Sequence, residues 1–298
     1  MKSTSTLLKS LSTENLDNDK GLKTDFPEFD QFTGGFKLGG LVLINGRVGM
    51  GVNHLTRCLV LNTSIRCKNS VGVFSLYQSQ ETYLLRLLAT EAGISFHDLK
   101  RNNVSDANDM VKTAKELIAK APIFISDAMS FSVQSIIAEV QEGIKWFGVK
   151  IVVIHGFNLL TDNTFCGISR YEELDRVASK LKDFAIYNDV TFVITHELPE
   201  MSSPNDNQEF CPTIREIYDD LSLAKYANLV TVLYRPEYYG IKTWPRFDES
   251  TECEAELRIV KNRNGNLESF RLFFDGYRSR FHEVGDDRYR KQPFTPNA

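Results

Sequence analysis

The sequence predicts an α/β protein with a mainly parallel, doubly wound sheet that ends in an antiparallel hairpin. Short apolar runs rich in Val, Ile and Phe alternate with amphipathic stretches along most of the chain. Because these runs do not alternate strictly with polar residues, they are typical of strands buried on both faces. Strand–helix alternation favours βαβ units. Near the C-terminus, Asn264-Gly265 lies between two strand-like runs, and this dipeptide is a strong hairpin signal.

Each expected element follows from its own pattern. Residues 132–147 and 170–187 each place their apolar side chains on one helical face, so both are expected to be helices. The hairpin strands are expected at 256–260 and 269–274. The expected parallel strands are Leu41–Asn45, Val71–Leu76, Ile123–Ser126, Ile151–Ile154, Thr191–Thr195 and Leu229–Leu233.

The composition is that of a soluble globular protein. The 298 residues are 42% hydrophobic and 25% charged, with a net charge of -4, so no general attraction to nucleic acid is expected. No run of 18 apolar residues or signal peptide occurs, so we expect a cytoplasmic protein with no membrane contact. The cysteine count is odd and has no C-x-x-C spacing, which predicts neither disulfides nor zinc; the cysteines are Cys58, Cys67, Cys166, Cys211 and Cys253.

A glycine-rich loop follows the first strand and precedes a helical run. Gly46 and Gly51 have the G-x-x-x-x-G spacing that lets backbone N–H groups surround a phosphate at a helix N-terminus. The next two residues should be Lys and Ser or Thr, which neutralise phosphate and hold magnesium. They are Val52 and Asn53, and we expect Asn53 to act as a helix cap or turn residue. The candidate loop remnant is Gly46, Arg47, Val48, Gly49, Met50, Gly51, Val52 and Asn53.

Several segments resemble the RecA-like motor domain of DnaB-type replicative helicases. Residues 21–51 resemble its opening, although their Thr-Gly-Gly also fits circadian-clock and recombination ATPases. FSLYQSQETYLLRLL, LYRPEYY and KNRNG resemble later helicase segments and narrow the choice. The resemblance covers residues 21–282 and implies a RecA-like P-loop NTPase fold. We expect a domain at 21–285, a tail or linker helix at 1–20 and a C-terminal tail at 286–298.

The chain departs from the family pattern at further positions. Tyr77 stands where the resemblance implies the carboxylate that polarises the attacking water, and His155 where it implies the magnesium-organising aspartate. Glu197 and Glu200 replace the glutamine and arginine after the fifth strand. With Val52 and Asn53, these changes remove the groups used for phosphoryl transfer within one subunit. We therefore expect no intact catalytic residues and no cofactor: weak residual ATP binding is possible, but magnesium is not expected.

Other family positions are retained. The resemblance implies that Lys261 and Arg263 reach a neighbouring subunit's ATP site as fingers, but solvated residues beside a good turn are the preferred interpretation. His155 and His196, with Glu197, could bind a metal, but a hydrogen-bonded histidine pair is the preferred interpretation. We accordingly predict no metal site.

The loops that bind DNA in the family lack basic residues here. Residues 161–169 and 201–212 contain neither Lys nor Arg, so DNA binding is expected to be weak or absent. The basic run 288–291 reads as a solvated terminus. An apolar stripe of Leu7, Leu8 and Leu11 could dock as a helix or belong to a frayed tail.

Three functions compete. The preferred one is a non-catalytic helicase-like domain that acts through protein contacts in DNA replication or a mobile element, with a catalytic DnaB-type helicase or a replication factor as partner. The alternatives are an active ATP-dependent helicase of the family and a binding module that uses the former ATP cleft for another ligand. For the preferred function we expect a monomer or small oligomer when the protein is alone.

Overall fold

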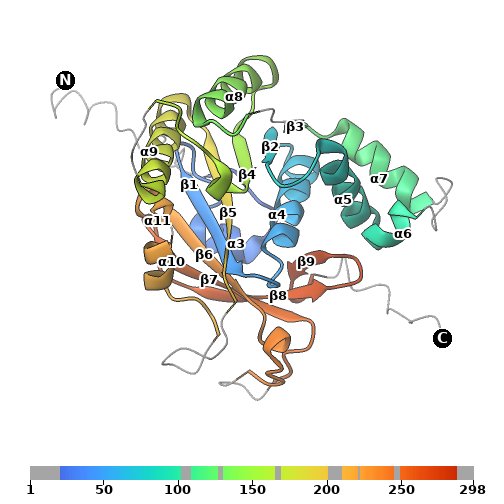
Figure 1. Ribbon diagram of the computed structural model, residues 1–298. Coiled ribbons are helices and arrows are strands. Elements are labelled where there is room, and N and C mark those ends of the chain that lie inside the picture. The colour runs from blue at the N-terminus through green and yellow to red at the C-terminus, as the bar shows by residue number, and fades with distance from the viewer. Residues whose placement is uncertain are drawn as a thin grey trace, which may run out of the picture.

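One nine-stranded sheet organises the domain in the computed structural model (Figure 1). Its strand order is β3-β2-β4-β5-β1-β6-β7-β8-β9. The structure describes residues 21–101, 109–126, 130–164, 169–200, 210–220, 222–244 and 249–286. The expected segment 1–20 with its Leu7–Leu11 stripe lies outside these residues, as does Cys166. The expected tail 286–298, with the basic run 288–291, also lies outside them except for Asp286.

Six strands form the parallel part of the sheet, as the sequence predicted. Each pairs in parallel register, and β1 lies at the centre between β5 and β6. The residues of β1, β2, β4 and β6 are all buried, which explains their continuous apolar sequences. These strands are β1 (Leu41–Arg47), β2 (Val71–Ser75), β3 (Ile123–Ser126), β4 (Ile151–His155), β5 (Thr191–Leu198) and β6 (Leu229–Tyr234).

The C-terminal strands are antiparallel, and they include one more strand than the expected hairpin. They are β7 (Glu254–Asn262), β8 (Ser269–Asp275) and β9 (Arg280–Glu283). The hairpin is confirmed, but Asn264-Gly265 does not form a tight two-residue turn. Residues 263–268 connect the two strands, and Gly265 does not have the positive φ that a tight Asn-Gly turn requires. The side chain of Asn262 instead bonds the carbonyls of Asn266 and Phe32, which holds a wider loop.

Helices cover both faces of the sheet (Figure 1). On one side lie α4 (Val52–Leu61), α5 (Gln80–Ala92), α6 (Phe96–Lys100) and α7 (Asp109–Lys120). Helix α4 continues directly into the π-helical turn η1 (Asn62–Arg66). On the other side lie α8 (Val133–Phe147), α9 (Arg170–Asn188), α10 (Ile214–Asp220) and α11 (Leu223–Tyr226). Shorter pieces are α3 (Pro27–Thr33), η2 (Phe157–Leu159) and η3 (Pro236–Tyr239). The helices expected at 132–147 and 170–187 are thus confirmed as α8 and α9.

The fold brings the carboxyl ends of neighbouring strands to one edge. The glycine-rich loop follows β1, Tyr77 follows β2, His155 ends β4, and Glu197 lies near the end of β5. In an open α/β sheet this edge is the usual place for a ligand site. None of the helices in the described part of the chain is long and apolar enough to span a membrane.

Candidate functional site

The loop after β1 turns at two glycines with left-handed backbone conformation. Gly49 and Gly51 have φ of 86° and 93°, values that favour glycine. Gly51 is the N-cap of α4 and offers no side-chain cap. The expectation that Asn53 caps this helix is therefore wrong: Asn53 lies inside the first turn, and its side chain points to other partners.

Two aromatic rings lie close to the loop glycines. A Cβ placed on Gly49 would lie 2.5 Å from the Tyr238 ring, and one placed on Gly51 would lie 3.1 Å from the Phe281 ring. The Tyr238 hydroxyl donates to the Glu200 carboxylate at 3.0 Å, which fixes its ring. Even an alanine at Gly49 would therefore require the ring to move.

The other loop residues are used for packing. Val52 is fully buried and has no polar side-chain atom with which to bind a phosphate. Met50 is also buried, whereas Val48 is exposed and donates its backbone N–H to the Leu198 carbonyl at 3.0 Å.

Arg47 points away from the loop. Its guanidinium donates to the carbonyls of Pro199 and Phe210 at 3.1 and 2.9 Å, and to the Glu216 carboxylate at 2.6 Å. It therefore holds the segments on either side of residues 201–209 against β1. Nothing in the spacing of the sequence indicated this role.

A chain of hydrogen bonds links four side chains at the carboxyl ends of β4 and β5. The Tyr83 hydroxyl lies 3.2 Å from Nε2 of His155, and Nδ1 of His155 lies 3.0 Å from the Asn53 amide oxygen. The Asn53 amide nitrogen then donates to the Glu197 carboxylate at 3.1 Å. The Thr195 hydroxyl lies 3.1 Å from the same Nδ1. These partners assign the proton of a neutral imidazole to Nδ1 and leave Nε2 as the acceptor.

The charge state of His155 fits this chain. Burial, aided by the positive charge of Arg57, lowers the pKa of His155 to about 3. Burial also raises the pKa of the Tyr83 phenol beyond its ordinary range. Both groups are therefore neutral at physiological pH. A neutral imidazole donor cannot replace a carboxylate that organises Mg²⁺.

Tyr77 turns outward at the end of β2. Its side chain is 61% exposed, and its hydroxyl bonds the Asn158 side chain in η2. The ring lies against Gly156, where a Cβ would come within 2.9 Å of it. Tyr77 thus links the ends of β2 and β4 and presents no carboxylate to the loop.

The two histidines do not form the expected pair. Successive side chains of β5 point to opposite faces, so Thr195 and Glu197 share the face of His155, whereas His196 lies on the other. Among the described residues, no group of three His, Cys, Asp or Glu side chains could hold a metal ion. The alternative metal site is therefore not formed by these residues.

The residues of this site do not fit Mg·ATP as the fold uses it. The side chain that should neutralise phosphate is apolar Val52, and the amide of Asn53 is bound to His155 and Glu197. His155 offers a hydrogen-bond donor where a metal needs an oxygen. These side chains thus lack the cation, hydroxyl and carboxylate that hold Mg·ATP in a P-loop enzyme.

The two finger candidates contact their own chain. Nζ of Lys261 donates to the carbonyls of Ala224 and Lys225, at 2.8 and 3.2 Å, in the last turn of α11. Arg263 donates to the Lys225 carbonyl at 3.1 Å. Both cations thus satisfy the carboxyl end of a short helix, a common role for basic residues.

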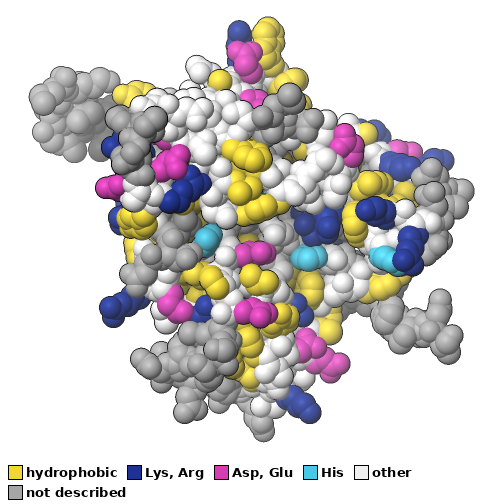
Figure 2. All heavy atoms as spheres, in the orientation of Figure 1, with side chains coloured by type: hydrophobic (Ala, Val, Ile, Leu, Met, Phe, Trp, Pro, Cys, Tyr) yellow, Lys and Arg dark blue, Asp and Glu magenta, His cyan; other side chains and the backbone are white. Residues whose placement is uncertain are grey.

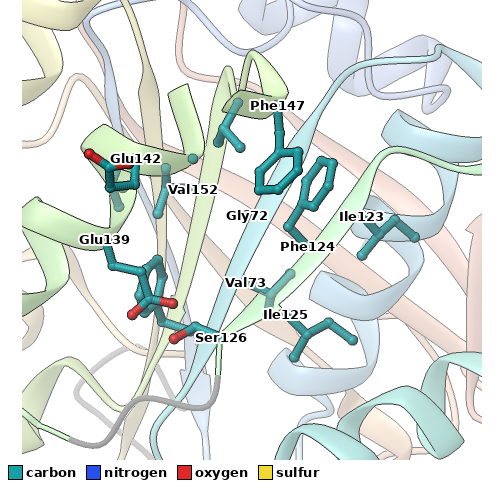
Figure 3. A pocket seen from close by; sticks show the side chains of 14 residues that line it. Gly72, Val73, Ile123, Phe124, Ile125, Ser126, Glu139, Glu142, Phe147 and Val152 are labelled. Atoms are coloured by element: carbon teal, nitrogen blue, oxygen red, sulfur yellow. The ribbon is translucent and has the colours of Figure 1, made fainter. Parts of the chain in front are cut away.

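A separate apolar cavity opens beside the edge strand β3. It has a volume of about 420 Å³ and lies between β2, β3 and α8 (Figure 3). The rings of Phe124 and Phe147 stack in its wall with centroids 4.3 Å apart, and Glu139 and Glu142 of α8 also line it. This cavity could not be predicted from the sequence, because strand and helix patterns do not reveal where two packed elements leave space.

The strand order and the strand–loop–helix unit define a P-loop domain of the RecA-like class. The family model described as DnaB-like helicase C terminal domain matches residues 21–283. The chain belongs to this family.

Curated relatives agree with that assignment. A probable replicative DNA helicase of Trieres chinensis is 29% identical over 265 residues, which cover 88% of this chain and 57% of the relative. The replicative DNA helicase DnaB of Geobacillus stearothermophilus is 24% identical over 279 residues, covering 93% and 60%. The chain therefore spans less than two thirds of the length of these relatives.

Solved structures share the fold. The ATPase domain of G40P superposes with a TM-score of 0.82 at 23% identity, covering 95% of this chain and 99% of that one. A DnaB-like replicative helicase whose interactions with primase were described gives a TM-score of 0.77 at 23% identity, covering 95% and 67%. The RecA-like fold predicted from the sequence is confirmed.

Proposed function

We propose that this DnaB-like domain does not hydrolyse ATP and acts through protein contacts in DNA replication or in a mobile element. The observation that carries the proposal is the chain from Tyr83 through His155 and Asn53 to Glu197. In this chain of hydrogen bonds, Asn53, at the position of the magnesium-binding hydroxyl, bonds His155, at the position of the magnesium-organising aspartate. Val52 supplies no charge, and Tyr77 no base.

The loss in the rate of phosphoryl transfer that these replacements cause can be estimated. Removing a single transition-state contact typically costs about 10²–10³ in rate. Lysine, metal and base act together in phosphoryl transfer, so their joint replacement leaves essentially no catalysis.

The partner we propose is a catalytic DnaB-type helicase or another replication factor. The interaction of one structural relative with primase supports a replication protein as partner. Exposed apolar side chains beside the Phe124–Phe147 cavity offer contact area: Trp146 is 65% exposed and Phe147 is 55% exposed.

Magnesium-dependent turnover is the decisive measurement. We expect no ATP hydrolysis above background in an assay where an active DnaB helicase serves as positive control. Turnover near 1 s⁻¹, an ordinary rate for enzymes, that disappears in the Gly51→Val variant would overturn the proposal. Gly51 is chosen because its φ of 93° and the Phe281 ring exclude a larger residue.

A further inference from the structure

Three arginines from different elements lie around His54, beside the loop. Arg57 belongs to α4, Arg86 to α5, and Arg235 follows β6. Burial, together with the positive charges of all three arginines, lowers the pKa of His54 to about 3. His54 also lies one turn before Arg57 in α4, and its ring packs on Phe274, over which the Arg235 guanidinium lies, so these groups are neighbours. On the face shown in Figure 2, Lys or Arg side chains lie next to a His side chain over the region of α4 and α5.

Arg57 is a buried cation without an anion. Its residue is 3% exposed, and its Nε has no hydrogen-bond partner. No ion pair or side-chain hydrogen bond joins it to any residue in the described parts of the chain. Burial lowers the pKa of its guanidinium; Tyr83 and Cys58 oppose this shift only in part, and the charge of Arg86 adds to it. An isolated buried charge is costly unless another group compensates it.

Arg86 and Arg235 are half-buried arginines that also lack an anionic partner in the described part of the chain. The Arg86 guanidinium lies 4.3 Å from the centroid of Phe96, and that of Arg235 lies 4.2 Å from the centroid of Phe274. The Nε atoms of both lack hydrogen-bond partners. Neither forms an ion pair within the described residues, and the charge of Glu237 reaches Arg235 only at longer range.

The site adjoins the loop. Nη1 of Arg235 donates to the Gly49 carbonyl at 3.4 Å, and the His54 ring packs edge-on against Phe274, 5.9 Å between centroids. The ten-residue helix α4 begins here without a side-chain cap. Its N-terminal dipole adds positive potential to that of the arginines.

We propose that Arg57, Arg86 and Arg235 form a metal-independent binding site for a phosphate-bearing anion beside the Gly46–Asn53 loop. A multivalent oxyanion compensates several guanidinium charges at once, and the planar donor fork of arginine matches phosphate oxygens. Mg²⁺ is not needed, because the cations belong to the protein. The inference goes beyond the proposed function, since it requires a bound anion but no hydrolysis.

Thermal unfolding in EDTA tests the site. Inorganic phosphate and pyrophosphate are the probes, compared with NaCl at equal ionic strength. We expect saturable stabilisation, with Tm rising by about 2–6 °C. ADP in EDTA forms a third arm: stabilisation by phosphate and ADP alike identifies the phosphate group as the ligand, whereas stabilisation by ADP alone would contradict a phosphate site.

The Arg57→Met variant separates a binding role from a structural one. It keeps the aliphatic packing and removes the unpaired charge, so we expect Tm in NaCl to be unchanged or higher and the phosphate affinity to fall at least tenfold. Arg235→Met, at the rim, should weaken phosphate in the same way. The control is Arg258→Met, because Arg258 pairs with Glu256 at 2.6 Å on β7; it should leave the phosphate shift unchanged.

Three results would overturn the inference. One is the absence of any phosphate-dependent shift. Another is an equal shift in all variants, which would mean an adventitious ion only. The third is a large loss of stability in Arg57→Met without loss of phosphate affinity. None of these outcomes depends on ATP turnover, so failure here and failure of the proposed function are distinguishable.

Discussion

Asn53 places its amide between His155 and Glu197, accepting from Nδ1 of the imidazole at 3.0 Å and donating to the carboxylate at 3.1 Å. In a P-loop enzyme this helix position carries the hydroxyl that holds Mg²⁺. Here the side chain instead ties α4 to the ends of β4 and β5. The Asn53 amide is thus engaged in a contact within the chain.

The Asn53→Ala variant should measure the worth of this contact. It leaves the Glu197 carboxylate without this donor and His155 with Thr195 as its remaining Nδ1 partner. We expect a loss of about 1–2 kcal/mol in the free energy of unfolding, measured by urea denaturation. The control is Asn69→Ala, whose exposed amide bonds the Lys23 carbonyl at 3.2 Å and should change little. Equal effects at the two positions would show that the bridge contributes nothing special.

A pH effect is expected at the contact between Glu283 and α3. Glu283 accepts the backbone N–H of Glu28 at 2.7 Å, and burial raises its pKa to about 7. A folded-state pKa above the unfolded value means that the contribution to stability is complete below about pH 4.5 and is lost as pH rises through 7.

The Glu283→Gln variant isolates that effect. Glutamine keeps an acceptor oxygen but does not titrate. The stability of the unmodified protein relative to this variant should fall by about 1–3 kcal/mol between pH 5 and pH 8. His54 and His155 contribute with the opposite sign, since their lowered pKa values cost stability as pH falls, but they are common to both proteins and cancel in the difference. A difference that is independent of pH would contradict the raised pKa of Glu283.

The sequence predicted the fold further than it predicted the site. Strands such as β1 and β4 are continuous apolar runs because both faces are buried, so sequence and structure carry the same information. The site depends on side-chain pairings across the sheet edge. That Tyr83 in α5 bonds His155 across 72 residues could not be read from spacing, and neither could the use of Arg47 to hold Pro199 and Phe210.

Single-stranded DNA is expected to bind weakly. Two cations beside the described residues 160–164 serve the fold: Lys180 pairs with Asp162 at 2.7 Å, and Arg170 donates to the Leu160 carbonyl at 2.7 Å. The face in Figure 2 shows basic and acidic side chains interspersed instead of a continuous basic track. Fluorescence anisotropy should give no sub-micromolar affinity at physiological salt. A tight complex with a steep salt dependence would place the contact surface elsewhere.

The finger hypothesis makes a prediction about a partner. If Arg263 serves another subunit's ATP site, the Arg263→Ala variant should lower the partner's ATPase rate in a mixed assembly. Its own stability should change by less than about 0.5 kcal/mol, because the bond to the Lys225 carbonyl is exposed. Arg258→Ala is the matched control, since that arginine pairs within β7. An unchanged partner rate with Arg263→Ala would leave Arg263 with a structural role alone.

The last prediction concerns assembly. A ring in which each subunit offered its hairpin on one side and its cleft on the other would be heterologous. In an active ring the nucleotide strengthens that contact, as cleft and fingers share its charge.

In this chain Glu197 is bound to Asn53 and Glu200 to Tyr238, while Lys261 and Arg263 bond the end of α11. These groups are therefore already bonded within one chain. An interface that does not draw on them has to rest on apolar area, and a stable one typically buries about 1,000 Å² or more. We therefore expect light scattering at micromolar concentration to show a monomer or small oligomer, with the same mass in the presence and absence of Mg·ATP. A hexamer that forms only with ATP would require a working cleft and would overturn the proposal that this domain is non-catalytic.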